Sequence, residues 1–241
     1  MIKKYIVYIK SIFLLSAVVF LYGFSSQKNN LRKITDLEIE FSNGANLFLT
    51  HEMVNKLLIQ KNEPLKNKAK SLINLHEFEK CVAESPLVEK AKVYMTIAGS
   101  LRTVVTQRTP IARVNTGKEG YYIDRQGLKM PLSANYSARV PLVSGQFTDK
   151  DIPTVFSLLK KINSEEFLTN LIVGIHKASN GEYMLKTRMY DQEIHIGGVG
   201  RMEVKFKKLL IFYKKIMQEK TIGDYKTINL KYDNQVVCTK Y

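Results

Sequence analysis

The sequence predicts an α+β protein that follows one N-terminal transmembrane helix. Three observations predict this fold class. An apolar run occupies residues 5–24, strand-like and helix-like segments share residues 34–108, and a long amphipathic helix pattern at 201–220 lies among short strand-like segments. We therefore expect a cytoplasmic stub at 1–4, a transmembrane helix at 5–24, a linker at 25–33 and domains at 34–108 and 109–241.

The apolar run is long enough to cross a membrane. About 20 residues at about 1.5 Å each reach about 30 Å, the thickness of the hydrocarbon core. Lys10 interrupts the run, but near the interface its long side chain can extend to the lipid headgroups. The alternative is a cleaved signal peptide, with Gly23 and Ser25 as the small residues before the cleavage site. The length of the run and the bulky aromatic residues beside that site favour a permanent anchor.

The orientation follows from the lengths of the two flanks more than from their charges. Lysine or arginine residues lie on both sides of the apolar run, so positive charge discriminates poorly. The short N-terminal stub cannot form a domain, and long domains translocate largely regardless of charge. With an anchor or with a signal peptide, residues 26–241 are therefore expected outside the cytoplasm.

The composition is strongly basic, with 37 Lys and Arg against 22 Asp and Glu and a net charge of +15. Such a charge suggests nucleic acid binding, but the basic residues are scattered, no basic motif is interleaved with aromatic residues, and the expected compartment holds no nucleic acid. A basic surface near anionic lipid or envelope polymer explains the charge. Cys81 and Cys238 lie in different halves, so we expect buried free thiols rather than a disulfide framework.

The first domain is predicted as strand, helix, helix, strand, strand, with both helices on one sheet face. Alternation over 34–41 predicts the first strand, and Thr50 is the expected N-cap of a helix that ends before Pro64. Asn74, with Glu77 three residues later, resembles a capping box that opens the second helix. Alternating segments at 91–97 and 101–108, separated by a Gly-Ser turn, predict the remaining strands.

The second domain begins with a strand, a turn and a strand over residues 121–127. Asp124 lies in this turn and is expected to accept hydrogen bonds from turn amides, because no second carboxylate, His or Cys is placed to work with it in catalysis. Thr148 and Asp151 open a helix whose inward face consists of Ile152, Val155, Phe156, Leu159 and Ile162. Strands are expected at 171–177, 183–188 and 192–196, the first two joined by an Asn180-Gly181 hairpin turn.

The helix predicted at 201–220 has the clearest periodicity in the chain. Its expected inward residues are Met202, Phe206, Leu209, Leu210, Tyr213, Ile216 and Met217. The glycine-rich residues 197–200 before it are interpreted as a strand-to-helix turn, because neither the GxGxxG nor the GK[ST] phosphate-binding pattern is present. Strands at 225–232 and 235–240, on either side of an Asp-Asn turn, close the domain.

The residue pattern does not favour an enzyme. The four histidines are far apart in the sequence and match no zinc-binding spacing. No G-x-S-x-G nucleophile motif occurs, and neither cysteine lies in a nucleophile motif. We therefore expect no catalytic site, no cofactor, no metal and no small-molecule substrate.

The segment order and several short motifs resemble a POTRA domain, and more specifically the FtsQ/DivIB family of bacterial cell-division proteins. Residues 86–93 match the family phrase P-x-V-x-x-A-x-V, and residues 121–127 match Y-x-I-D-x-x-G. Residues 107–112 match the E-R-x-P-x-A junction, although Gln107 replaces the usual acid. Residues 228–232 resemble the closing I-D-L-R-Y strand. The resemblance covers nearly the whole chain and implies a non-catalytic membrane scaffold at the division septum, with FtsB and FtsL as partners.

The last predicted strand is the candidate partner-binding site. A strand at 235–240 would close the sheet with its outer edge uncovered, and its free N–H and C=O groups would be a template for an incoming strand. The family resemblance implies that the last strands bind FtsB and that the first domain helps to localise the protein. The alternative is a strand that merely completes the sheet. The candidate residues are Tyr232, as an aromatic anchor, and Gln235, Val236, Val237, Cys238, Thr239 and Lys240.

A second functional class is an accessory of protein transport or outer-membrane assembly that carries POTRA domains. Such proteins typically have several POTRA repeats or a C-terminal β-barrel. No repeat is visible in this sequence, and the C-terminal part holds too few long alternating strands for a barrel. The division scaffold is therefore the favoured prediction.

Overall fold

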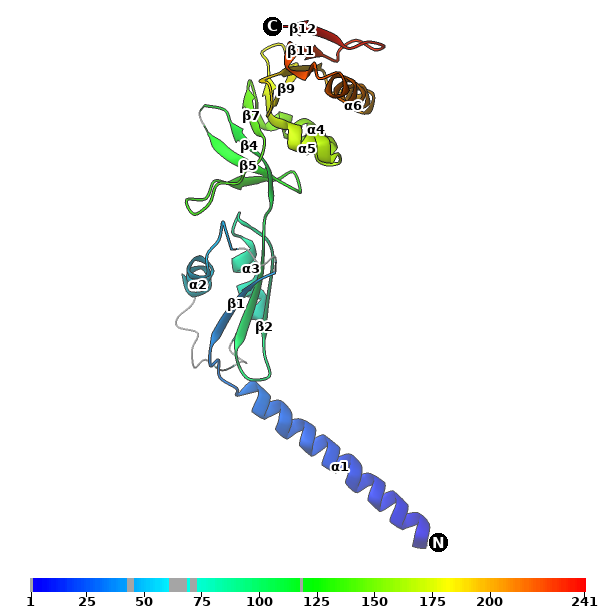
Figure 1. Ribbon diagram of the computed structural model, residues 1–241. Coiled ribbons are helices and arrows are strands. Elements are labelled where there is room, and N and C mark those ends of the chain that lie inside the picture. Colours follow the sequence, from blue (N-terminus) through cyan, green and yellow to red (C-terminus); the bar gives the residue numbers. More distant parts are fainter. Residues whose placement is uncertain (1, 43–45, 61–68, 70–72, 118) are drawn as a thin grey trace. The chain divides into compact units, whose positions relative to one another are not determined.

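The computed structural model describes residues 2–42, 46–60, 69, 73–117 and 119–241. The chain divides into two compact units, Met1–Gln107 and Arg108–Tyr241, and each contains its own sheet (Figure 1). The predicted α+β class is confirmed. The division falls after Gln107, next to the expected junction between 108 and 109.

The chain begins with the long helix α1 (Ile2–Asn30). Within its stretch Tyr8–Asn29, an 18-residue window has a mean hydropathy of 1.7 and is not buried within the protein. In the described part of the chain this is the one helix long and apolar enough to cross a membrane. The helix continues past the predicted end at Phe24, and Lys28 in its last turn interacts favourably with the negative end of the helix dipole.

The first unit contains a three-stranded sheet in the order β1-β3-β2. The central strand β3 runs parallel to β1 and antiparallel to β2. Its side chains alternate between buried and half-buried because one face of the sheet packs on the core. The elements are β1 (Leu37–Phe41), α2 (His51–Gln60), α3 (Leu75–Ala83), β2 (Val88–Met95) and β3 (Leu101–Gln107).

The two helix starts of this unit differ in their capping. The backbone N–H of Met53 donates to Thr50 Oγ1 across 3.3 Å, so the predicted cap of α2 is confirmed. The predicted capping box at α3 is wrong, because the side chain of Asn74 makes no capping hydrogen bond. The Asn74 carbonyl oxygen instead accepts from the N–H groups of Glu77 and Phe78, as in an ordinary first helical turn. Pro64, the predicted stop after α2, lies outside the described residues.

The second unit is built on a nine-stranded mixed sheet in the order β12-β11-β10-β9-β8-β7-β4-β5-β6. The pairs β4·β7, β7·β8 and β10·β11 are parallel, and the others are antiparallel. Its elements are β4 (Pro110–Asn115), β5 (Gly120–Asp124), β6 (Lys129–Pro131), β7 (Leu142–Gly145), α4 (Ile152–Asn163), α5 (Glu166–Leu171), β8 (Ile172–Lys177), β9 (Tyr183–Thr187), β10 (Glu193–Gly197), α6 (Met202–Gln218), β11 (Tyr225–Asn229) and β12 (Val237–Lys240).

The turns of this unit follow the predicted chemistry. The Asp124 carboxylate accepts from the backbone N–H groups of Gln126 and Leu128 across 2.9 and 2.8 Å, so its interpretation as a turn residue is confirmed. Gly181 has a φ of +82° in the turn between the antiparallel strands β8 and β9, which confirms the predicted hairpin. The short helix α5 was not predicted.

The core of the second unit lies between the sheet and the helices α4 to α6, which cover one face of it (Figure 1). Helix α6 buries Phe206, Leu209, Tyr213 and Ile216, as its periodicity predicts. The predicted inward position of Met217 is wrong, because this side chain is 49% exposed. Ile216 fills the inward position of that turn, and the next residue is rotated by about 100° around the helix.

Candidate functional site

The strand β12 forms one edge of the nine-stranded sheet. It pairs antiparallel with β11, and no described strand lies on its other side. Four of the candidate residues lie in this strand, namely Val237, Cys238, Thr239 and Lys240. Tyr232, Gln235 and Val236 precede the strand, in the connection from β11. The structure thus places the candidate edge at the predicted end of the sheet, but with a shorter strand.

The backbone hydrogen bonds around β12 show which of its peptide groups point outward. The backbone N–H of Tyr241 donates to the Asp224 carbonyl. Because successive peptide groups of a strand point to opposite sides, the N–H and C=O groups of Thr239 and Val237 point toward β11. The backbone N–H of Leu230, just after β11, donates to the His195 carbonyl on β10. The N–H and C=O groups of Thr227 and Asn229 therefore point to the other side, toward β12. These two residues are the register partners of Thr239 and Val237. Both observations leave the N–H and C=O groups of Cys238 and Lys240 at the open edge.

The side chains of β12 alternate between the two faces of the sheet. The Cys238 side chain is half-buried against the core, and this burial raises the pKa of its thiol. Val237 is 40% exposed on the opposite face, beside Thr239, whose hydroxyl is hydrogen-bonded to Thr227. An incoming strand would therefore pair with the outward peptide groups and contact Val237 and Thr239 with its own side chains.

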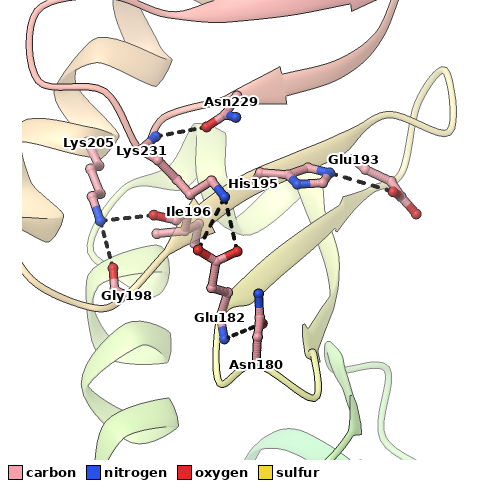
Figure 2. A network of polar contacts seen from close by, with 9 residues as sticks. All are labelled: Asn180, Glu182, Glu193, His195, Ile196, Gly198, Lys205, Asn229 and Lys231. Carbon is pink, nitrogen blue, oxygen red and sulfur yellow. Dashed lines mark hydrogen bonds and ion pairs between the residues drawn. The ribbon is translucent and has the colours of Figure 1, made fainter.

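A polar network holds the connection that leads into β12 (Figure 2). The Lys231 ammonium donates to both carboxylate oxygens of Glu182 across 3.0 and 3.2 Å. Its backbone N–H donates to the side chain of Asn229, which fixes the chain direction just after β11. The lysine stem passes over Gly197, where a Cβ atom would lie 2.8 Å from Lys231 Cδ and Cγ. Gly197 also has a φ of +70°, so a residue with a side chain would be strained there, which the sequence alone did not reveal.

Two lysines of α6, Lys205 and Lys208, bind backbone carbonyls in the same region. Lys205 donates to Ile196 and Gly198 across 2.9 and 2.6 Å, at the end of β10 (Figure 2). Burial, together with the nearby charges of Arg201 and Lys208, lowers the pKa of Lys205. Lys208 donates to the carbonyls of Tyr232 and Asp233 in the connection before β12. Lys205 thus attaches the end of β10 to α6, and Lys208 attaches the connection before β12 to the same helix.

Gln192 anchors the other end of β11 from a fully buried position. Its side-chain nitrogen donates to the carbonyls of Ile222 and Tyr225 across 2.6 and 3.0 Å. Its side-chain oxygen accepts from the Tyr213 hydroxyl across 2.8 Å, and burial raises the pKa of that tyrosine. Both side-chain polar atoms of Gln192 therefore hold the start of β11 against α6.

The opposite edge of the sheet is less suited to strand addition. Strand β6 has three residues, and Pro131 at its end has no backbone N–H to donate. Tyr232, the predicted aromatic anchor, is 50% exposed in the connection before β12. An open edge without proline and an exposed aromatic residue beside it thus occur together at the C-terminal end of the sheet.

The described side chains of this region do not form a cluster of metal ligands. In the ranges that the structure describes, no three His, Cys, Asp or Glu side chains are grouped as metal ligands would be. The arrangement instead offers main-chain donors and acceptors at a sheet edge, which is the chemistry of protein–protein recognition by strand addition.

Comparisons with known proteins match both units. A family model described as FtsQ/DivIB, C-terminal related matches residues 109–239, and one described as a POTRA-like domain matches residues 32–106. The chain is 28% identical over 171 residues to Cell division protein FtsQ of Salinibacter ruber (strain DSM 13855 / M31), covering 65% of this chain and 66% of that protein. It is 31% identical over 90 residues to Cell division protein FtsQ of Koribacter versatilis (strain Ellin345), covering 36% and 26%. The chain thus spans just under two thirds of the first relative and about a quarter of the second.

Proposed function

Because the chain belongs to the FtsQ/DivIB family, we propose that it is a non-catalytic, single-pass membrane scaffold of the bacterial division machinery. Helix α1 anchors it in the cytoplasmic membrane, and residues 26–241 act outside the cytoplasm at the division septum. The apolar stretch Tyr8–Asn29 supports the anchor. The POTRA-like unit helps to bring the protein to the septum, as the family resemblance implies.

The partner-binding site in this proposal is β12, and its partners are FtsB and, with it, FtsL. The single observation that carries the proposal is the open edge of β12, where the peptide groups of Cys238 and Lys240 face outward. A segment of FtsB adds a strand at this edge, so main-chain hydrogen bonds supply the affinity. Tyr232 contributes an exposed aromatic contact beside the added strand.

The test replaces a residue with an outward N–H by proline in the full chain, reconstituted in lipid nanodiscs. Cys238→Pro removes a donor of the open edge and leaves the pairing with β11 intact, so the circular dichroism spectrum should be unchanged. FtsB binding should weaken about tenfold, which corresponds to about 1.4 kcal/mol. Cys238→Ala is the matched control and should bind FtsB as the natural chain does.

Val237→Pro provides the contrast, because the Val237 N–H faces β11. This change should disrupt the C-terminal hairpin itself and lower the thermal midpoint. Unchanged FtsB binding by a folded Cys238→Pro chain would contradict strand addition at β12. Full binding by a folded chain truncated after Tyr232 would contradict it as well.

The cellular role is tested separately by depletion. Cells depleted of the protein should grow as undivided filaments and should keep a normal content of outer-membrane proteins. Loss of outer-membrane proteins without a division defect would instead support the transport or assembly accessory.

A further inference from the structure

The second unit contains a pocket of about 460 Å³ that shares no residue with β12. It lies where the start of β4, the segment before β7, the ends of α4 and α5 and the start of β8 meet. Its apolar wall consists of Ile111, Val140, Pro141, Ile172 and Val173. Ile172 is buried in the core, Ile111 packs against that core, and the other three are half-buried.

Two arginines give the pocket a positive charge. Arg139 and Arg188 line it, and none of its described lining residues is acidic. Arg188 is held in place because its Nε donates to the Asn170 carbonyl across 3.2 Å and its backbone N–H donates to Leu171 across 2.8 Å. Within the described ranges, the terminal Nη atoms of Arg188 and the whole guanidinium of Arg139 have no partner. The pocket therefore presents unused donors beside apolar walls.

This combination has a defined chemical complement. An arginine guanidinium matches a carboxylate with two parallel hydrogen bonds, and both arginines of this pocket are exposed to an incoming group. A pocket of this volume falls in the range of ligand sites and is larger than a bare carboxylate needs. The remaining space is bounded by aliphatic side chains and suits an aliphatic neighbour of the acid.

We propose that this pocket binds an Asp or Glu side chain of a partner protein, presented next to an aliphatic residue. A protein partner fits better than a free anion, because half-buried apolar walls complement an aliphatic side chain and offer nothing to a small hydrated ion. The net charge of +15 favours encounter with acidic segments in general, and the two arginines select among them. This second docking site goes beyond strand addition at β12.

The test is a selection from a random heptapeptide phage library on the full chain in nanodiscs of zwitterionic lipid. The natural chain should enrich peptides with Asp or Glu next to Leu, Ile or Val. The double variant Arg139→Gln/Arg188→Gln should lose this enrichment. Lys207→Gln/Lys214→Gln, which removes two exposed charges from α6, is the matched control and should retain it.

The selected peptide is then measured by fluorescence anisotropy. Exchange of its acid for the amide should weaken binding at least tenfold, and so should Arg139→Gln alone. Because Arg139 has no partner in the described part of the chain, this single variant tests the pocket even if the double variant does not fold.

Three results would overturn the proposal. The first is a selection without an acidic–aliphatic motif, and the second is the same motif enriched equally by the double arginine variant. The third is competition in which inorganic phosphate at millimolar concentration displaces the peptide completely, since the site would then bind a free anion. None of these measurements involves FtsB or β12, so their outcome is independent of the test of the proposed function.

Discussion

The guanidinium of Arg108 donates to the Asp124 carboxylate across 2.6 Å, and this ion pair links the first residue of the second unit to the end of β5. The Asp124 side chain is 1% exposed, and its other oxygen accepts the two turn N–H groups described above. The carboxylate is thus fully partnered in a buried position. Removal of one partner from such a pair leaves an uncompensated buried charge.

Asp124→Asn should therefore lower the free energy of unfolding of the second unit by about 3 kcal/mol. The amide would place an N–H donor or a weaker acceptor against Arg108. Asp149→Asn is the matched control, because Asp149 pairs with Lys129 at the surface and should lose less than about 1 kcal/mol. Chemical denaturation of the full chain measures the unfolding free energy of both variants. Equal losses would contradict the larger cost expected for the buried pair of Arg108 and Asp124.

The buried contact between Gln192 and Tyr213 should be detectable as coupling between two substitutions. Gln192→Leu leaves the Tyr213 hydroxyl and two backbone carbonyls without a donor or acceptor, and should cost about 3 kcal/mol. Tyr213→Phe should cost about 1 kcal/mol. The double variant should lose about 1 kcal/mol less than the sum. Strict additivity in thermal or chemical unfolding would mean that the hydrogen bond contributes nothing.

The stability of the second unit should fall at acidic pH through Asp151. Burial alone would raise the pKa of this carboxyl, but donation from Lys177 and Thr148 outweighs it and holds the pKa below its ordinary value. A lowered folded-state pKa contributes stability above the unfolded value of about 4, and this contribution is lost as pH falls through the folded value. The difference in unfolding free energy between the natural chain and Asp151→Asn should thus be largest near neutral pH. It should shrink below about pH 4, and a difference constant down to about pH 2 would contradict this.

Membrane anchoring should depend on where the lysine of α1 lies. The double variant Lys10→Leu/Leu14→Lys moves the charge toward the middle of the apolar stretch, where it costs roughly 2.5–3.5 kcal/mol on insertion scales. The variant should be extracted more readily by alkaline carbonate than the natural chain. Leu14→Gln, which adds a polar group without charge, should be intermediate. Equal extraction of all three, or a soluble natural product that begins at Ser26, would contradict a permanent anchor.

Periodicity predicted most helices and strands of this fold because burial on one face imposes a repeat that is visible in the sequence. Helix α6 and the hairpin at Asn180-Gly181 follow directly from such local patterns. The residue spacing wrongly predicted a capping box at Asn74, because a cap depends on the side-chain rotamer and not on residue type alone. The free thiols of Cys81 and Cys238 are half-buried rather than fully buried.

Gln107, the last residue of the first unit, makes contacts that the sequence motif does not predict. Gln107 departs from the acid expected there, and its side-chain oxygen accepts from the backbone N–H groups of Phe48 and Leu49 across 3.1 and 3.2 Å. Its side-chain nitrogen also donates to the Leu49 carbonyl, which a carboxylate could not do. These partners are almost sixty positions away in the chain, so the sequence pattern could not predict them.

The candidate edge was predicted from its order in the chain, but its chemistry required the structure. Which N–H groups face outward depends on register, and the register is set by the pairings of β11 with β10 and β12. Lys231 and Gln192 support this edge through residues that fold next to them from distant segments. Such contacts leave no periodic signal in the sequence.

The open edge of β12 also has a consequence for the solubility of the protein. A strand edge that is open to any partner is equally open to β12 of a second copy, which is how sheet edges cause aggregation. The strand is only four residues long and ends in a lysine, and each copy carries a net charge of +15. Electrostatic repulsion and the small number of available hydrogen bonds therefore oppose pairing between copies at this edge.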